Sequence, residues 1–269
     1  LPIEVLEVSR TLRALKGPSD RLLARKPHIA FHGQIKMVPF PFTKNLPDLG
    51  RYVHQSNVRW LYFSWLEAEL RPEYMYLLDT TGAIPGLTIR HATRRYPAVL
   101  YEIGPEFGRE PDWFRNDTLV AVHNLRARLL INARDAQSLV QLASIEAARG
   151  DYAQTERLLE RAVRVRPGQV DLWLWLGDAR LRLRKPTAAD EAFVRAQLIE
   201  PQNATAQIGR GWASRNADRP QDAAALWRPV IEHARDPVTL TEMIDLYRRL
   251  GDREAEALAR QTLDRLGAP

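Results

Sequence analysis

The first hundred residues alternate between the apolar period of a helix and that of a strand. Ile3–Leu15 carries its apolar side chains on one helical stripe, which Gly17 and Pro18 end. Residues 58–64 are aromatic and β-branched, which predicts a strand. The same patterns predict strands at 21–25, 35–40, 87–91 and 98–103, the last two as a hairpin, and helices at 27–33, 46–55 and 66–78, the last interrupted near Pro72. Because strands and short helices alternate, residues 1–117 are expected to form a small α/β domain with a partly parallel sheet.

The rest of the chain, residues 118–269, follows a longer repeat. Residues 136–169 align position by position with residues 170–203, and Pro167 and Pro201 occupy the same position of the two segments. This period of about 34 residues, with its large and small apolar positions, predicts helix–turn–helix units that are each too small to bury an apolar face alone. Two weaker units and half of a preceding one complete the pattern at 204–236, 237–269 and 119–132. We therefore expect an all-α solenoid of about three and a half repeats.

These units resemble tetratricopeptide repeats. The resemblance rests on the turn at Gly150, on the small residues Ala143 and Gly177 in the first helices, and on the closing prolines. Stacks of this kind present an extended concave surface for binding. The resemblance therefore implies a protein or peptide partner on the face lined by the first helix of each repeat. By register, that face carries Gln137, Val140, Ser144, Asp178, Arg182, Trp212, Arg215, Asn216, Asp245, Arg248 and Arg249.

Three arginines of that face, Arg182, Arg215 and Arg248, recur at a constant interval, one in each of three successive units. Such a ladder favours an acidic peptide or a phosphorylated glycan as the ligand. The alternative is chance, because arginine supplies 34 of the 39 positive charges of the chain. Members of the family that bind chaperone tails use a Lys/Asn carboxylate clamp, from which Val140 and Ser144 depart, so that kind of partner is not expected.

Charge and composition argue against several classes of function for this chain and exclude others. The formal net charge of +6 is spread evenly, with 16 bases and 13 acids in residues 1–117 and 23 and 20 in the remainder. Because no basic run occurs, nucleic-acid binding is not expected. The absence of cysteine excludes disulfides, thiolate metal sites and a cysteine nucleophile. No apolar run approaches the roughly 18 residues that span a bilayer. The chain begins at Leu1 without a methionine or a signal peptide, so we expect processing or truncation upstream.

A second resemblance covers most of residues 5–105. Four segments are similar to the extracytoplasmic domain that follows the last membrane helix of bacterial polytopic glycosyltransferases, such as protein O-mannosyltransferases and aminoarabinose transferases. They are ARKPHIAFHG (24–33), VPFP (38–41), LYFSWLEAELRPEY (61–74) and PAVLYEIGPEFG (97–108). The resemblance implies a parent membrane enzyme that uses a polyprenyl-phosphate sugar donor. The catalytic acids of that family lie in a loop far upstream, so no catalytic residue is carried over to this chain.

The densest basic stretch of the first domain is its main candidate for binding chemistry. His28 and His32 are four residues apart, as two metal ligands on a helix would be, but no third ligand is near, and neither a metal nor another cofactor is expected. The stretch is also a candidate contact for a phosphate or for anionic lipid head groups, with an ordinary polar loop as the alternative. It consists of Arg25, Lys26, His28, His32 and Lys36.

No catalytic constellation emerges from the sequence. The acid pairs Glu67/Glu69 and Glu254/Glu256 are two residues apart, and side chains at that spacing do not face each other on a helix. Nucleophile-elbow, phosphate-loop and dinucleotide-binding motifs are absent from the chain.

Three hypotheses of function follow. The first is the non-catalytic extracytoplasmic (periplasmic) tail of a bacterial membrane glycosyltransferase-like protein, which positions partners or acceptors through the repeat groove. The second is a free-standing soluble adaptor, which would lie in the cytoplasm instead of on the extracytoplasmic side. The third is a small enzyme that acts on nucleotide sugars through the α/β domain. Apolar segments upstream of Leu1 would favour the first hypothesis over the second, and sugar transfer by these residues alone would favour the third.

Overall fold

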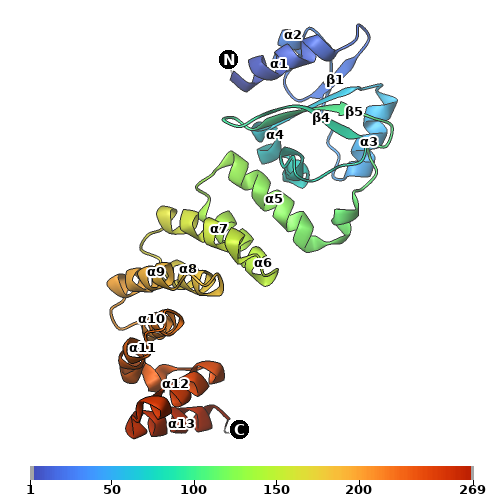
Figure 1. The fold of residues 1–269 in the computed structure, drawn as a ribbon. Coiled ribbons are helices and arrows are strands. Elements are labelled where there is room, and N and C mark those ends of the chain that lie inside the picture. The colour runs from blue at the N-terminus through green and yellow to red at the C-terminus, as the bar shows by residue number, and fades with distance from the viewer. Residues whose placement is uncertain (1–2, 268–269) are drawn as a thin grey trace. The chain divides into compact units, whose positions relative to one another are not determined.

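The computed structural model describes residues 3–267, and the contacts divide the chain into two compact units between Ser138 and Leu139. The first unit is built around a sheet, whereas the second is entirely helical (Figure 1). The expected succession of a small α/β domain and an all-α repeat domain is confirmed.

The first unit contains short helices and strands in alternation. In chain order they are α1 (Ile3–Leu15), β1 (Arg21–Ala24), α2 (Pro27–Gly33), β2 (Lys36–Pro39), α3 (Leu46–Gln55), β3 (Trp60–Ser64), α4 (Trp65–Leu70), η1 (Pro72–Leu78), β4 (Leu87–Thr93), β5 (Ala98–Ile103), η2 (Asp112–Arg115) and α5 (Asp117–Ile131).

The five strands form one mixed sheet in the order β2-β1-β3-β5-β4. β1 pairs in parallel with β2 and with β3, while β5 pairs antiparallel with β3 and β4. Helical crossovers produce the parallel pairs, because a tight turn can only reverse the chain. The short connection between β4 and β5 makes the hairpin that the sequence predicts.

β3 is the centre of the sheet and is buried at all five positions. Its side chains alternate between two cores. Trp60 and Tyr62 pack with α1 and α2, whereas Leu61 and Phe63 pack with α3 and η1. Helices thus cover both faces of β3, which explains why its sequence is apolar without alternation.

The helix expected at 66–78 is broken at Arg71. α4 ends at Leu70, and η1 begins at Pro72 as a 3₁₀ helix. Proline lacks the N–H that an α-helix interior needs, and its ring clashes with the preceding turn. Arg71 consequently lies between the two helices, with an extended φ of −134°.

α5 packs in the first unit. It packs against η1 and η2, and its Ala127 and Ile131 join the core of the sheet domain. His123 Nδ1 lies 2.8 Å from the buried carboxylate of Asp79. The half repeat expected at 119–132 is therefore a helix of the first unit, and the contacts place the division after Ser138 where we expected it after residue 117.

Helix pairs fill residues 136–267 of the described chain. They are α6 (Ala136–Ala148) with α7 (Tyr152–Val165), α8 (Val170–Arg182) with α9 (Pro186–Ile199), α10 (Ala204–Asn216) with α11 (Pro220–Trp227) and η3 (Arg228–His233), and α12 (Pro237–Leu250) with α13 (Arg253–Gly267). The first helices begin at Ala136, Val170, Ala204 and Pro237, so the interval between successive pairs is about 34 residues. The repeat read from the sequence is therefore the structural period.

Aromatic rings set the spacing between successive pairs. The Phe193 ring of α9 lies against Gly177 of α8 and Gly209 of α10, where an added Cβ would come within 2.6 Å and 2.5 Å of the ring. Trp227 lies against Gly211 in the same way and donates its indole N–H to the Ile208 carbonyl at 2.9 Å. Glycine is required at these positions because no side chain fits between the backbone and the ring.

Candidate functional site

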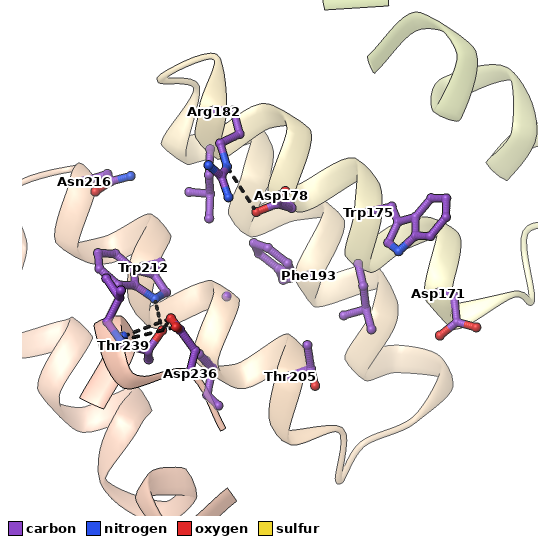
Figure 2. Close-up of a pocket in the computed structure, with 15 residues that line it drawn as sticks. Asp171, Trp175, Asp178, Arg182, Phe193, Thr205, Trp212, Asn216, Asp236 and Thr239 are labelled. Atoms are coloured by element: carbon purple, nitrogen blue, oxygen red, sulfur yellow. Dashed lines mark hydrogen bonds and ion pairs between the residues drawn. The ribbon is translucent and has the colours of Figure 1, made fainter. Parts of the chain in front are cut away.

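A large hollow of the second unit opens between α8, α10 and the start of α12. It is a cavity of about 720 Å³, within the usual range of ligand sites. Its lining combines aromatic rings with carboxylates, and Figure 2 shows side chains from these helices gathered around it. The residues that matter for its chemistry are Asp171, Trp175, Asp178, Arg182, Phe193 and Trp212.

Three rings give the cavity an aromatic lining of graded exposure. Phe193 is buried and closes its base, and its ring lies against Gly177 and Gly209. Trp212 is half-buried, because its indole N–H donates to Thr239 Oγ1 at 3.1 Å and its ring meets Trp227 edge to face. Trp175 is 47% exposed. An indole this open is the apolar surface that a ligand would cover most readily.

The charges of the cavity are mainly negative. Arg182 lies 3.7 Å from Asp178 on its own helix, so this pair is close to neutral. Asp236 caps α12: the Thr239 hydroxyl and the backbone N–H groups of Thr239 and Val238 hold its pKa below the ordinary value against the opposing effect of burial. Asp171 is exposed and has no cationic partner among the described residues. The lining therefore favours a cation beside an aromatic surface.

A smaller hollow of about 190 Å³ adjoins the cavity along α8. Ser144 of α6 and Tyr152 of α7 line it, and it shares Trp175 and Asp178 with the cavity. Trp175 and Asp178 thus form the partition between two hollows on one side of the repeats. The two hollows adjoin each other along α8, and we refer to them together as the groove.

The structure separates the groove residues expected from the sequence into two groups. Those that line the cavity are Asp178, Arg182, Trp212 and Asn216. Those that are not part of its lining are Arg215, Asp245, Arg248 and Arg249. Val140 and Gln137 lie on α6 and do not line either hollow, whereas Ser144 lines the smaller one.

The arginine ladder is engaged by acids of the repeats. Arg215 donates from Nε to Glu242 of α12 at 2.7 Å, which links two successive repeats. Arg248 pairs with Asp245 at 3.0 Å and with Glu256 of α13 at 3.1 Å. Because each guanidinium already has a carboxylate, the ladder offers little free positive charge to an acidic ligand.

Sequence reasoning missed Asp171 and Trp175. Trp175 lies on the first helix of its repeat, next to the buried Leu176 and Leu172 stripe. A large aromatic residue outside the apolar stripe of an amphipathic helix is the signal that would have found it.

The basic stretch of the first unit is dispersed along the β1/β2 pair. The parallel register aligns Arg21 with Lys36 and Ala24 with Pro39, so Arg25 and Lys36 lie at opposite ends of the paired strands. Arg25 is half-buried and donates to Glu67 at 3.0 Å. Lys26 and His28 are exposed at the start of α2, and the partly buried His32 packs edge to face on Phe31.

Two kinds of feature are absent from the described residues, 3–267. They contain no group of three or more His, Cys, Asp or Glu side chains arranged to hold a metal ion. None of their helices has the length and apolarity needed to cross a bilayer.

Helix pairs that repeat about every 34 residues, with small residues facing aromatic rings, are typical of tetratricopeptide-type solenoids. In agreement with this class, residues 146–212 match the family model described as tetratricopeptide repeat. No curated protein sequence matches the chain.

Several solved structures have a similar fold. A structure titled "MamA RS-1 ArsTM double mutant" is 15% identical, covers 57% of this chain and 87% of its own, and gives a TM-score of 0.50. MamA 41-end from Desulfovibrio magneticus RS-1 is 15% identical, with 57% and 88% covered and a TM-score of 0.49. YrrB, titled a TPR protein with an unusual peptide-binding site, is 17% identical, with 57% and 79% covered and a TM-score of 0.47. At these identities the likeness concerns the fold alone.

Proposed function

We propose that the chain is a protein-interaction scaffold that binds an extended peptide segment in the groove along α8 and α10. The observation that carries this proposal is the open indole of Trp175 beside the unpaired carboxylate of Asp171, over a cavity of about 720 Å³. Exposed aromatic residues in a concave site are the usual anchors of protein interfaces.

The preferred segment carries a lysine or arginine next to an apolar side chain. The carboxylates of the lining outnumber its single arginine, and that arginine faces Asp178. Complementary charge selects a partner by attracting the right one and repelling the wrong one. The sign of the lining therefore argues for a basic segment, in place of the acidic ligand that the arginine ladder suggests.

Peptide selection tests this proposal. The immobilised chain is expected to enrich peptides with a basic residue beside an aromatic or aliphatic one from a random library. Trp175→Ala should weaken the binding of an enriched peptide by about 2 kcal/mol, the scale of an interface hot spot. Asp171→Lys should weaken it further by placing like charges together.

Arg248→Glu is the matched control, because Arg248 is exposed and lies outside the cavity lining. Its affinity for the enriched peptide should equal that of the unmodified chain. If acidic peptides were enriched and Arg248→Glu abolished their binding, the cavity would not be the binding site, and the arginine ladder would be.

We also propose that this scaffold is the non-catalytic tail of a membrane glycosyltransferase-like protein on the extracytoplasmic side. The four segments at 24–33, 38–41, 61–74 and 97–108 that resemble such tails support this proposal. The test is fractionation of cells that express the whole coding region, followed by protease treatment of spheroplasts. Membrane association with cleavage from outside is expected, whereas recovery in the cytosolic fraction would count against it.

A further inference from the structure

Arg71 is a buried guanidinium without a carboxylate. Only 7% of the residue is exposed, and it lies between α4 and η1 where Pro72 interrupts the helix. Its Nη2 makes one long hydrogen bond, 3.4 Å to the Phe40 carbonyl, and its Nε has no acceptor among the described residues. No acidic partner of Arg71 occurs within residues 3–267. Charged groups are rarely buried without a partner, because leaving water costs them several kcal/mol.

Arg71 lines a cavity of about 460 Å³ that is separate from the repeats. Two further cations, Arg25 and Lys44, line the same cavity, and Glu73 is its one carboxylate. Arg25 is already paired with Glu67 at 3.0 Å, whereas Lys44 is exposed. The lining is thus net positive, with Arg71 as its buried charge.

The cavity is also lined by large apolar side chains that are open to solvent. Phe42 is 100% exposed and Leu70 is 61% exposed, which is unusual for two large apolar side chains beside one hollow. The guanidinium of Arg71 lies 4.7 Å from the ring centre of Phe40 and 5.6 Å from that of Phe42. Cation and apolar surface are therefore presented together.

The loop that carries Phe42 and Lys44 is held in place. The Tyr74 hydroxyl donates to the Asn45 carbonyl at 2.7 Å and lies 2.9 Å from Thr43 Oγ1. Burial raises the pKa of Tyr74, so the phenol stays protonated and keeps this anchor at neutral pH. A fixed loop lets the cavity exist before a ligand arrives, which reduces the entropy lost on binding.

We propose that this cavity binds a phosphate monoester whose organic part is apolar. A phosphate monoester carries nearly two negative charges, which suits Lys44 and the unpaired Arg71 better than the single charge of a carboxylate. The planar guanidinium takes phosphate oxygens in pairs, and Phe42 and Leu70 receive the apolar part. Of the basic stretch that the sequence offered as a candidate phosphate contact, only Arg25 lines this cavity. Lys26, His28, His32 and Lys36 are not part of its lining. This site is independent of the repeat groove.

Calorimetric titration of the complete chain tests the proposal with three soluble probes: phenyl phosphate, inorganic phosphate and benzoate. Phenyl phosphate should bind most tightly, inorganic phosphate more weakly, and benzoate at least about tenfold more weakly than phenyl phosphate. Phosphatidylcholine vesicles with and without phosphatidic acid distinguish a lipid source from a soluble one. Binding that requires phosphatidic acid would assign the ligand to a membrane, and binding of phenyl phosphate alone would assign it to a soluble ester.

Surface variants keep the test independent of folding. Phe42→Ala and Lys44→Ala alter exposed side chains, and each should weaken phenyl phosphate several-fold with an unchanged melting temperature. Phe42→Ala should leave inorganic phosphate binding unaltered. Arg71→Lys keeps the charge but not the paired donors, and should weaken both phosphates about tenfold or more. Equal binding of benzoate and phenyl phosphate, or phenyl phosphate affinities that none of the three variants changes, would overturn the assignment.

Discussion

At the scale of residues, Phe193 shows how glycines let two helix backbones pack closely against one large ring. The residue is 3% exposed, and its ring lies between two glycines of different helices. A helix interior normally disfavours glycine by about 1 kcal/mol relative to alanine. Here the loss is offset because the helices can approach the ring on both sides, and one of those sides forms the base of the groove.

Gly209→Ala should therefore destabilise the second unit although it improves helix propensity. The new Cβ would lie 2.5 Å from the Phe193 ring, which is buried and cannot move away freely. Overpacking of this kind costs about 1–3 kcal/mol. Gly168→Ala is the control, since nothing lies within 4 Å of its added Cβ. Urea unfolding followed by circular dichroism measures both, and a Gly209→Ala chain as stable as the control would contradict the packing argument.

Asp236 is the clearest single cap of the repeats. It accepts hydrogen bonds from the backbone of Val238 and Thr239 and from the Thr239 hydroxyl at 3.2, 3.0 and 2.7 Å. Asp236→Ala should cost about 1 kcal/mol, the usual loss for a helix cap. Because the folded pKa of Asp236 lies below 3.8, its contribution is complete above that pH and is lost as the pH falls through the folded pKa.

Chemical unfolding at pH 7 and at pH 3 measures this effect. The difference between the unmodified chain and Asp236→Ala should be present at pH 7 and should shrink at the lower pH. Asp264→Ala, an exposed position of α13, should show no difference at either pH. A difference for Asp236→Ala that is independent of pH would show that the capping carboxylate is not its source.

At the scale of elements, α5 shows that one amphipathic helix can suit two different cores. Its sequence has the small and large positions of a repeat helix, yet Ala127 and Ile131 pack in the core of the sheet domain. The Trp113 ring lies 4.3 Å from the His123 ring, and His123 reaches the Asp79 carboxylate. Both apolar packing and a buried polar contact thus tie α5 to the sheet domain.

A fragment of residues 3–138 should consequently fold, whereas a fragment of residues 3–117 should be less stable. Removing α5 takes away the buried partner of Asp79 and uncovers part of the core, and the lost hydrogen bond alone costs about 1–3 kcal/mol. The shorter fragment should melt at least about 5 °C lower. His123→Ala in the longer fragment should give an intermediate melting temperature by circular dichroism. Equal melting of the two fragments would show that α5 does not stabilise this unit.

At the scale of the whole molecule, the two units hold their cores by different means. In the first unit, contacts across the sheet join residues far apart in the sequence, as β1 with β3 and β3 with β5. In the second unit, each helix packs mainly on its neighbours along the chain. Arginines reinforce these local contacts: Arg180 donates to Glu156 at 3.2 Å and Arg210 donates to Asp190 at 2.9 Å. Burial alone would raise the pKa of Glu156, but hydrogen bonds from Lys185 and Arg180 lower it.

Removal of the last helices should therefore also loosen the packing of the helix that precedes them. Trp227, Ile231, Leu240, Met243 and Tyr247 share one core. A chain ending at Asp236 should lose the packing of η3 as well as α12 and α13, melt at a lower temperature and bind a hydrophobic dye. A chain ending at Leu263 loses only exposed positions of the described residues and should melt as the longer chain does. Dye binding by neither fragment would contradict the shared core.

Much of this architecture follows from the sequence, because periodicity reports local structure. The bounds of α1 and α3 agree with their apolar stripes, and the interval between Pro167 and Pro201 is the repeat of the solenoid. Register also places Asp178, Arg182, Trp212 and Asn216 on one face of the first helices, and these four residues line the cavity.

The sequence by itself determined which segments are helices or strands, and that the second half is a stack of paired helices. Only the tertiary structure decided that α5 joins the sheet domain, that the arginine ladder is neutralised by acids such as Glu242, and that Arg71 is buried without an acid. The reason is physical. Backbone preferences and apolar periods act over a few residues, whereas the partner of a charge is fixed by distances between segments that only folding brings together.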